Sequence, residues 1–224
     1  GMIIMGCQPL NEKIAQGSME GYMDSFTVLP SLTSVCDGIH RYGAKIVCQL
    51  TPGTGRNAFP DTLGNPPMSA SEIPSAFDPN LMCHALTKEE IAQMMNDFKF
   101  AAGVAMDAGY DAIEIHATVG YLIDQFLSPV WNKRTDEYGG TPEKNTRFAK
   151  DIYHAIREVV GPDVPILFRI SLDHRFNGGR DLEYSMKILK ELEKEGIDAF
   201  DIDAGCYETL DYIFPPAYFL YFAS

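Results

Sequence analysis

Polar side chains that could take part in catalysis or binding lie at the ends of predicted strands or just after them. These are Gln49, His116, Arg169 and Asp203, and Tyr121 follows closely after His116. A tyrosine phenol is a weak acid that stays protonated at pH 7, so it suits general acid catalysis. An arginine buried on an apolar strand requires an anionic partner. Each of these residues also has a purely structural alternative: a hydrogen-bonded core residue for His116, a packing side chain for Tyr121 and an internal ion pair for Arg169.

The elements that would position these residues alternate along the chain. Strands are predicted at residues 2–7, 45–50, 111–117, 165–171 and 198–204, and helices at 29–42, 87–108, 141–161 and 182–195. Thr87 and Glu90 form a capping box at the start of the second helix. Residues 53–86 form a long excursion rich in Pro, Ser, Asn and Gly, which is typical of functional loops. Residues 118–140 are predicted to be a loop.

This alternation predicts βαβ units and a parallel sheet. Right-handed crossovers then leave a doubly wound sheet or a (β/α)8 TIM barrel. The barrel is favoured because polar residues gather at the strand ends and no G-x-G-x-x-G follows a strand. About five strand–helix units are found where a barrel has eight. The prediction is therefore one incomplete TIM-barrel domain spanning residues 1–224.

The composition excludes several classes of protein. The chain is 46% hydrophobic and carries 31 acidic against 18 basic residues, a net charge of −13, which disfavours nucleic-acid binding. Its apolar runs are too short to span a bilayer, and no signal peptide is visible. The five cysteines are scattered without a C-x-x-C pair, and no metal-ligand cluster is present. We therefore expect a cytoplasmic protein with no metal, nucleic-acid or membrane partner.

One long motif is specific. Residues 114–140 read EIHATVGYLIDQFLSPVWNKRTDEYGG. This stretch resembles the segment after the fourth barrel strand in the Old Yellow Enzyme family of flavin-dependent ene-reductases. Other stretches agree with the same family, namely residues 42–45, 49–56, 86–91, 169–171 and 207–216. Within the family, residues 49–56 and 207–216 are most similar to the 2-enoate reductase and 2,4-dienoyl-CoA reductase branch.

The resemblance implies an FMN cofactor, NADH or NADPH as electron donor, and an activated alkene as substrate: a 2-enoate, an enone or an enoyl-thioester. In such enzymes FMN N5 gives a hydride to the β-carbon, and a side chain gives a proton to the α-carbon. Tyr121 matches the proton donor, and His116 matches the donor to the substrate carbonyl. The family often has a second donor where this chain has Val119. Tyr207 is therefore a candidate second acid and substrate contact.

The resemblance also assigns flavin contacts. Gln49 matches an amide that pairs with the pyrimidine edge, and Arg169 matches a cation near flavin N1 and O2. The alternative for Arg169 is an internal ion pair with Asp201 or Asp203. Cys7 is a further flavin candidate, and its alternative is a small buried apolar side chain.

The polar residues of the loops divide into two groups. Arg56, in a glycine-rich loop, is a candidate for binding a substrate carboxylate or phosphate, and a solvated arginine is the alternative. A structural polar network that folds the loop over the barrel mouth is predicted for Asn132, Arg134, Asp136 and Tyr138.

Parts that the family uses are not found in this sequence. Family members bind the FMN phosphate with loops after the seventh and eighth strands, and longer relatives add an iron–sulfur site and FAD- and NADH-binding domains. We therefore expect weak FMN binding by the chain alone, and self-association through the open barrel edges. Two interpretations stay open: an ene-reductase represented by a fragment or shortened gene, and a truncated, non-catalytic relative that acts as a folding or assembly unit.

Overall fold

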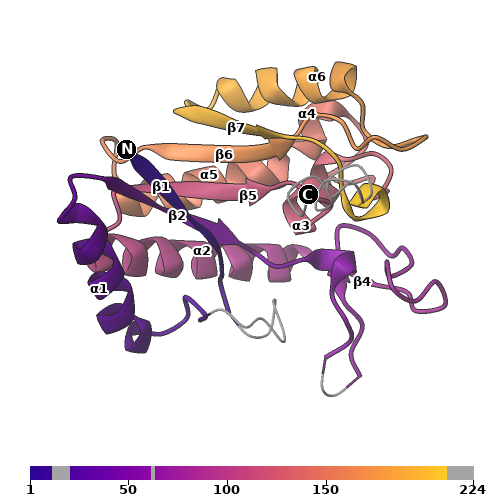
Figure 1. Ribbon diagram of the computed structural model, residues 1–224. Helices are drawn as coiled ribbons and strands as arrows, with labels where there is room; N and C mark the ends of the chain where they lie inside the picture. Colours follow the sequence, from indigo (N-terminus) through magenta and orange to yellow (C-terminus); the bar gives the residue numbers. More distant parts are fainter. Residues whose placement is uncertain (12–20, 62–63, 211–224) are drawn as a thin grey trace, which may run out of the picture.

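Five parallel strands form the central sheet of the computed structural model, which describes residues 1–11, 21–61 and 64–210 (Figure 1). The strands are β1 (Met2–Pro9), β2 (Lys45–Thr51), β5 (Ala112–Ala117), β6 (Ile166–Ser171) and β7 (Ala199–Asp203). Their spatial order, β1-β2-β5-β6-β7, follows the chain order. In a doubly wound sheet the spatial order of the strands reverses at a switch point, whereas in a TIM barrel it follows the chain order throughout. The described strands are thus five adjacent strands of such a barrel, as predicted.

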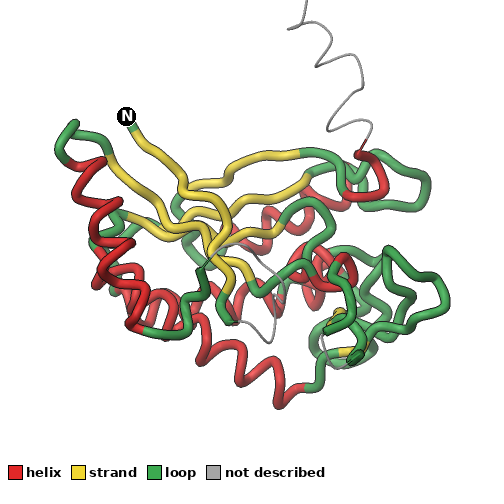
Figure 2. Tube along the Cα trace, turned by 60° about the horizontal axis from the view of Figure 1, so that its bottom comes forward, coloured by secondary structure: helices red, strands yellow, loops and turns green. Residues whose placement is uncertain are grey.

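The long helices cover one face of this sheet (Figure 2). They are α1 (Leu29–His40), α2 (Lys88–Ala108), α5 (Arg147–Val160) and α6 (Leu182–Glu193). Alternate strand residues such as Ile46, Ile113 and Phe168 pack with the helices in the main core. The residues between them face the other way, where Val47, Ala112 and Leu167 form a small separate cluster. This second face, here called the inner face, corresponds to the interior of a barrel.

Two predicted boundaries are wrong. Residues 122–127 lie in the predicted loop but form the helix α3 (Leu122–Leu127), in which every residue is buried. A helix that is buried all round lacks the polar–apolar contrast that reveals a helix in a sequence. The helix predicted at 141–161 is divided into α4 (Pro142–Asn145) and α5 at Thr146, whose hydroxyl donates to the Glu143 carbonyl at 2.6 Å.

Smaller elements lie before α1, in the long excursion and in the final turn. The strands β3 (Met68–Ser69) and β4 (His84–Ala85) form a parallel pair. The short helices are η1 (Phe26–Val28), η2 (Gly55–Asn57) and η3 (Tyr207–Thr209). Within the described ranges, no helix has the length and apolar character needed to cross a membrane.

The sheet has two edge strands in the described part of the chain, β1 and β7. Ile3 on β1 is 48% exposed and Ile202 on β7 is 52% exposed. Unpaired edges of this kind favour pairing with another strand. Self-association through these edges stays a prediction.

The capping box of α2 yields the first test. The Thr87 hydroxyl accepts from the Glu90 amide at 3.1 Å, and the Glu90 carboxylate accepts from the Thr87 amide at 2.8 Å. Thr87→Ala removes one of these bonds, so the free energy of unfolding should fall by about 1 kcal/mol. Urea denaturation measures this change. Ser25→Ala, which uncaps only the three-residue η1, is the control and should have the smaller effect; the reverse order would contradict the assignment.

Candidate active site

Four neighbouring strands carry the predicted polar residues to one end of the inner face. Gln49, His116, Arg169 and Asp203 lie at the carboxyl ends of β2, β5, β6 and β7. The strand register places His116 beside Arg169. It also places Gln49 beside Glu114. The prediction that these side chains share the carboxyl end of a parallel sheet is confirmed.

His116 is a neutral imidazole at physiological pH. It is 7% exposed, and burial, with a further contribution from the Arg169 charge, lowers its pKa to about 4. Its Nδ1 atom is buried and makes no hydrogen bond to any described residue. The ring stacks on that of Tyr121, with centroids 4.9 Å apart. A neutral, buried histidine with one unsatisfied nitrogen is equipped to hydrogen-bond a ligand.

Tyr121 and Tyr207 come together above His116. Tyr121 stands at the N-terminus of α3, and Tyr207 begins η3 after β7. Their hydroxyl oxygens are 3.4 Å apart, and their ring centroids are 5.9 Å apart. A parallel bridge between Val119 and Cys206 holds the two loops side by side. The structure thus brings together the three residues to which the sequence assigned catalysis.

Arg169 forms the internal ion pair that the sequence analysis left open as the alternative to a flavin contact. Its Nη2 atom lies 3.0 Å from Asp203, and its Nε atom lies 3.7 Å from Asp201. The Nε atom is nevertheless buried without a hydrogen bond in the described chain, while the side chain as a whole is 37% exposed. Contact of Arg169 with a flavin stays a prediction.

Gln49 also has a protein partner. Its amide donates to Glu114 at 2.5 Å, and the second Glu114 carboxylate oxygen is buried without a partner among the described residues. Burial raises the pKa of Glu114, an effect that the Gln49 hydrogen bond only partly opposes. A cofactor that reached the amide would have to share it with Glu114.

The two other candidates lie at the margins of the site. Cys7 is half-buried on β1, where the register with β2 shifts between Met5 and Gln8. Arg56 on η2 forms an ion pair with Glu208 on η3, so its charge is already matched. The flavin role of Cys7 and the substrate role of Arg56 stay predictions.

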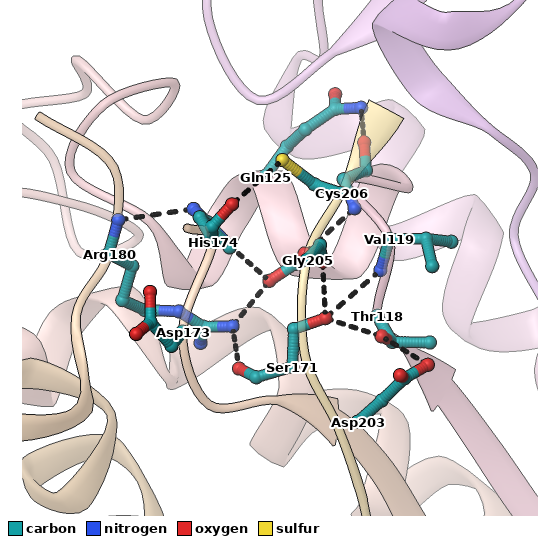
Figure 3. Close-up of polar contacts among 12 residues, drawn as sticks. Thr118, Val119, Gln125, Ser171, Asp173, His174, Arg180, Asp203, Gly205 and Cys206 are labelled. Atoms are coloured by element: carbon teal, nitrogen blue, oxygen red, sulfur yellow. Dashed lines mark hydrogen bonds and ion pairs between the residues drawn. The ribbon is translucent and has the colours of Figure 1, made fainter. Parts of the chain in front are cut away.

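A buried ion pair beneath these loops was missed by the sequence analysis. The Arg180 Nη2 atom donates to the Ser171 carbonyl at 2.5 Å (Figure 3). The same atom donates to Asp124 at 2.6 Å. The other Asp124 oxygen accepts from the Gly120 amide at 2.8 Å. Both charged side chains are fully buried. Burial would raise the pKa of Asp124, but Arg180 and His174 overcome this and hold it below its usual range.

His174 completes this group, here called the Asp124 network (Asp124, His174 and Arg180). Its Nδ1 atom accepts from the Arg180 backbone amide at 3.1 Å, so Nε2 carries the proton and faces Asp124 at 3.3 Å. An aspartate inside the apolar run LIDQFL was a usable signal, since a buried carboxylate requires a partner. Its identity was not readable, because Arg180 and His174 lie far along the chain.

Ser171, the last residue of β6, connects the loops that follow β5 and β7 beside this network (Figure 3). Its hydroxyl lies 2.5 Å from the Thr118 hydroxyl, accepts from the Val119 amide at 3.3 Å and donates to the Gly205 carbonyl at 2.9 Å. Val119 has φ = 53°, a conformation that β-branched residues rarely adopt. The hydrogen bond from its amide helps to hold this backbone, which turns the chain toward Tyr121.

The predicted loop network is confirmed as structural. Asn132 donates to the Phe126 and Tyr138 carbonyls at 2.8 and 2.7 Å. Arg134 pairs with Asp136 at 2.7 Å and donates to the Leu86 carbonyl at 2.6 Å. These contacts hold residues 128–140 against the long loop formed by residues 53–86.

Comparison with known proteins identifies the family of the chain. The family described as NADH:flavin oxidoreductase / NADH oxidase matches residues 1–213. The chain belongs to this family. Of the stretch 207–216 that carried part of the resemblance, residues 211–216 lie outside the described residues.

Relatives of this family are named as reductases, oxidases and dehydrogenases. The chain is 37% identical to a cinnamate reductase of Clostridium sporogenes over 80% of its own length and 29% of that protein. It is 37% identical to an NADH oxidase of Thermoanaerobacter brockii, covering 88% of this chain and 30% of the relative. An NADPH dehydrogenase of Listeria welshimeri is 38% identical, and the match covers 79% of this chain and 50% of the relative. The chain therefore spans about 30–50% of the length of these proteins.

Solved structures show the same fold. A 2-naphthoyl-CoA reductase in complex with 2-naphthoyl-CoA superposes with a TM-score of 0.83 at 28% identity, covering 92% of this chain and 33% of that one. The old yellow enzyme homologue from Zymomonas mobilis gives a TM-score of 0.78 at 26% identity, and the match covers 90% of this chain and 59% of that one. The predicted family and barrel fold are thus both confirmed.

The Asp124 network should control stability. Arg180→Met leaves the Asp124 charge buried without its main partner, so the free energy of unfolding should fall by about 3–5 kcal/mol in urea denaturation. Glu137→Gln removes an exposed ion pair with Lys88 and is the control, with no measurable change expected. Adding Asp124→Leu to Arg180→Met should restore part of the loss, because no uncompensated charge then remains. A loss as small as that of the control would contradict the role of the network.

The protonation of His116 can be measured by NMR titration of its ring. In the urea-unfolded chain the ring should titrate near the usual value of about 6.5. In the folded chain it should stay neutral until the pH approaches about 4. Because folding lowers the pKa, the titration of His116 should leave the free energy of unfolding unchanged above about pH 6.5 and lower it as the pH falls toward 4, where only the unfolded chain takes up the proton. His116→Gln identifies the resonance, and a folded-state midpoint near 6.5 would refute the assignment.

Proposed function

We propose that this chain forms part of an FMN-dependent oxidoreductase that reduces an activated C=C bond in a 2-enoate, an enone or an enoyl-thioester. The observation that carries the proposal is the neutral His116 stacked on Tyr121 at the carboxyl end of the sheet. Family membership supports flavin chemistry, and NADH or NADPH is the proposed electron donor. One relative is named a cinnamate reductase, and cinnamate carries a C=C bond conjugated to a carboxylate.

The residues present fit a flavin at the inner face. The His116 Nδ1 and Arg169 Nε atoms are buried and lack hydrogen bonds within the described chain, so a ligand at this face can satisfy them. Gln49 and Arg169 would contact the isoalloxazine, and Cys7 is a candidate at its other side. When bound and reduced, FMN supplies the hydride of the reaction.

The chain's own side chains would then handle the substrate oxygen and the proton. A neutral His116 donates one N–H to the carbonyl oxygen, where negative charge develops in the transition state. The Tyr121 hydroxyl delivers a proton to the α-carbon, and a phenol is protonated at pH 7 as this step requires. Tyr207, whose hydroxyl oxygen lies 3.4 Å from that of Tyr121, would return a proton to Tyr121 or hold the substrate.

Arg56 has a narrower proposed role at the rim. A substrate carboxylate or phosphate would have to compete with Glu208 for its guanidinium. We therefore propose Arg56 as a peripheral substrate contact and His116 and Tyr121 as the groups at the reacting atoms.

Tyr121→Phe tests the proposed proton donor. With excess FMN reduced anaerobically, flavin reoxidation by an enoate should slow by about 10²–10⁴-fold, because the general acid is lost while the ring remains. Reduction of the flavin by the electron donor should be nearly unchanged. His116→Ala should impair substrate binding and rate together, since the carbonyl is held in both ground and transition states. Stopped-flow absorbance of the flavin follows both half-reactions.

The control is Tyr42→Phe, which removes a hydroxyl from a tyrosine that is 91% exposed after α1. It should leave both half-reactions unchanged. If Tyr121→Phe reoxidises as fast as the parent, the proton donor lies elsewhere and Tyr207 is tested next. A parent chain that binds no flavin and reduces no alkene would favour the non-catalytic alternative.

A further inference from the structure

Two carboxylates of β7 face the guanidinium of Arg169 on the neighbouring strand. The register pairs Arg169 with Asp201, and Ser171 with Asp203. Side chains two residues apart on a strand point to the same face, so Asp201 and Asp203 both lie on the inner face with Arg169. The Arg169 Nη2 atom is 3.0 Å from Asp203, and its Nε atom is 3.7 Å from Asp201. One guanidinium therefore meets two carboxylates.

Asp203 is held beside Arg169 by hydrogen bonds from outside the ion pair. The Thr118 hydroxyl donates to one Asp203 oxygen at 3.2 Å (Figure 3). Arg169 donates to that same oxygen, and the Ala204 amide donates to the other oxygen at 2.8 Å. The carboxylate cannot turn away from Arg169 without breaking these bonds. The pairing of charges is therefore a fixed part of the folded chain.

Glu114 adds a third carboxyl group to the same surroundings. It lies on β5, is fully buried, and interacts electrostatically with both Arg169 and Asp201. Burial raises the pKa of Glu114, so this group takes up a proton more readily than an exposed glutamate does. Asp201 and Asp203 outnumber Arg169 whichever form Glu114 takes.

The charge beside a flavin ring affects how readily the flavin is reduced. Reduction of FMN by two electrons and one proton leaves one negative charge on the ring. A cation beside the ring stabilises that charge and raises the reduction potential, whereas a carboxylate opposes it. Under the proposed function Arg169 contacts the isoalloxazine. A carboxylate that offsets the charge of Arg169 should then lower the reduction potential, which makes the reduced flavin a stronger hydride donor.

We propose that Asp203 tunes the reduction potential of the bound flavin downward by offsetting the charge of Arg169, with a smaller contribution from Asp201. This inference rests on the proposed function and deepens it, because it concerns how strongly the reduced cofactor donates hydride. Asp203 acts through the charge at the ring and needs no contact with the substrate. The unequal contributions follow from the distances of 3.0 and 3.7 Å to the guanidinium.

The affinities of the two forms of FMN test this proposal. Equilibrium dialysis of the full chain measures the dissociation constants of oxidised FMN and of anaerobically reduced FMN, and their ratio reports the shift in potential on binding. Asp203→Asn removes the charge but keeps the shape and an acceptor for Thr118, so reduced FMN should gain affinity relative to oxidised FMN. We expect the ratio of the oxidised to the reduced constant to rise about tenfold, which corresponds to about 30 mV for a two-electron couple.

Two further variants control for the site of the lost charge. Asp201→Asn should raise the ratio by less, because its carboxylate is farther from Arg169. Asp173→Asn is the matched control: Asp173 is 36% exposed, as Asp201 is, but it pairs with Arg175 in the loop after β6, so the ratio should stay that of the parent. Urea denaturation establishes that each variant is folded. If Asp203→Asn does not fold, the comparison of Asp201→Asn with Asp173→Asn decides.

An unchanged ratio in Asp203→Asn, or an equal change in Asp173→Asn, would overturn the tuning role and leave Asp203 a structural partner of Arg169. Anaerobic reoxidation of reduced FMN by 2-butenoate and by 3-buten-2-one, an enoate and an enone, tests the proposed function separately. A shifted ratio with reduction of neither alkene supports the tuning role and overturns the reductase. An unchanged ratio with alkene reduction does the reverse. A parent chain that binds neither form of FMN overturns both proposals.

Discussion

The buried ion pair between Asp124 and Arg180 is the interaction on which the candidate active site depends. Moving either charge out of water costs several kcal/mol, so each residue is tolerable only with the other. Each residue also makes a hydrogen bond to the backbone: Asp124 accepts from the Gly120 amide, and Arg180 donates to the Ser171 carbonyl. One pair thereby fixes the chain before Tyr121 and the end of β6. His174 adds a hydrogen bond from the loop after β6.

This rigid base makes an otherwise unfavourable backbone possible at Val119. A β-branched residue at φ = 53° costs of the order of 1–3 kcal/mol and persists only where its surroundings determine it. Here the surroundings are the Ser171 hydroxyl and the bridge to Cys206. The strained residue links His116 on the strand to Tyr121 on the helix. The distance between those rings is therefore set by contacts beneath the site as well as within it.

Local signals were sufficient to predict the framework but not the connections within it. Strand alternation, the Thr87 capping box and polar residues at strand ends depend on neighbours in sequence, so the sheet, α2 and the positions of Gln49, His116 and Arg169 were predictable. Helix α3 was missed because its burial removes any periodic pattern. The pairing of Arg56 with Glu208 and of Asp124 with Arg180 was out of reach, because each joins residues that only the folded barrel brings together.

The distribution of charge on the inner face limits what this site can bind. Three carboxylates, those of Glu114, Asp201 and Asp203, lie around Arg169 on this face. Burial raises the pKa of Glu114, and protonation of that carboxyl would relieve part of the excess negative charge. With His116 neutral, the groups nearest a bound carbonyl then act by hydrogen bonding rather than by full charge. Such donors stabilise an oxygen on which negative charge develops during reaction without strongly attracting one that is charged beforehand. Under the proposed function, a substrate oxygen beside His116 would therefore be stabilised by hydrogen bonding as negative charge develops on it.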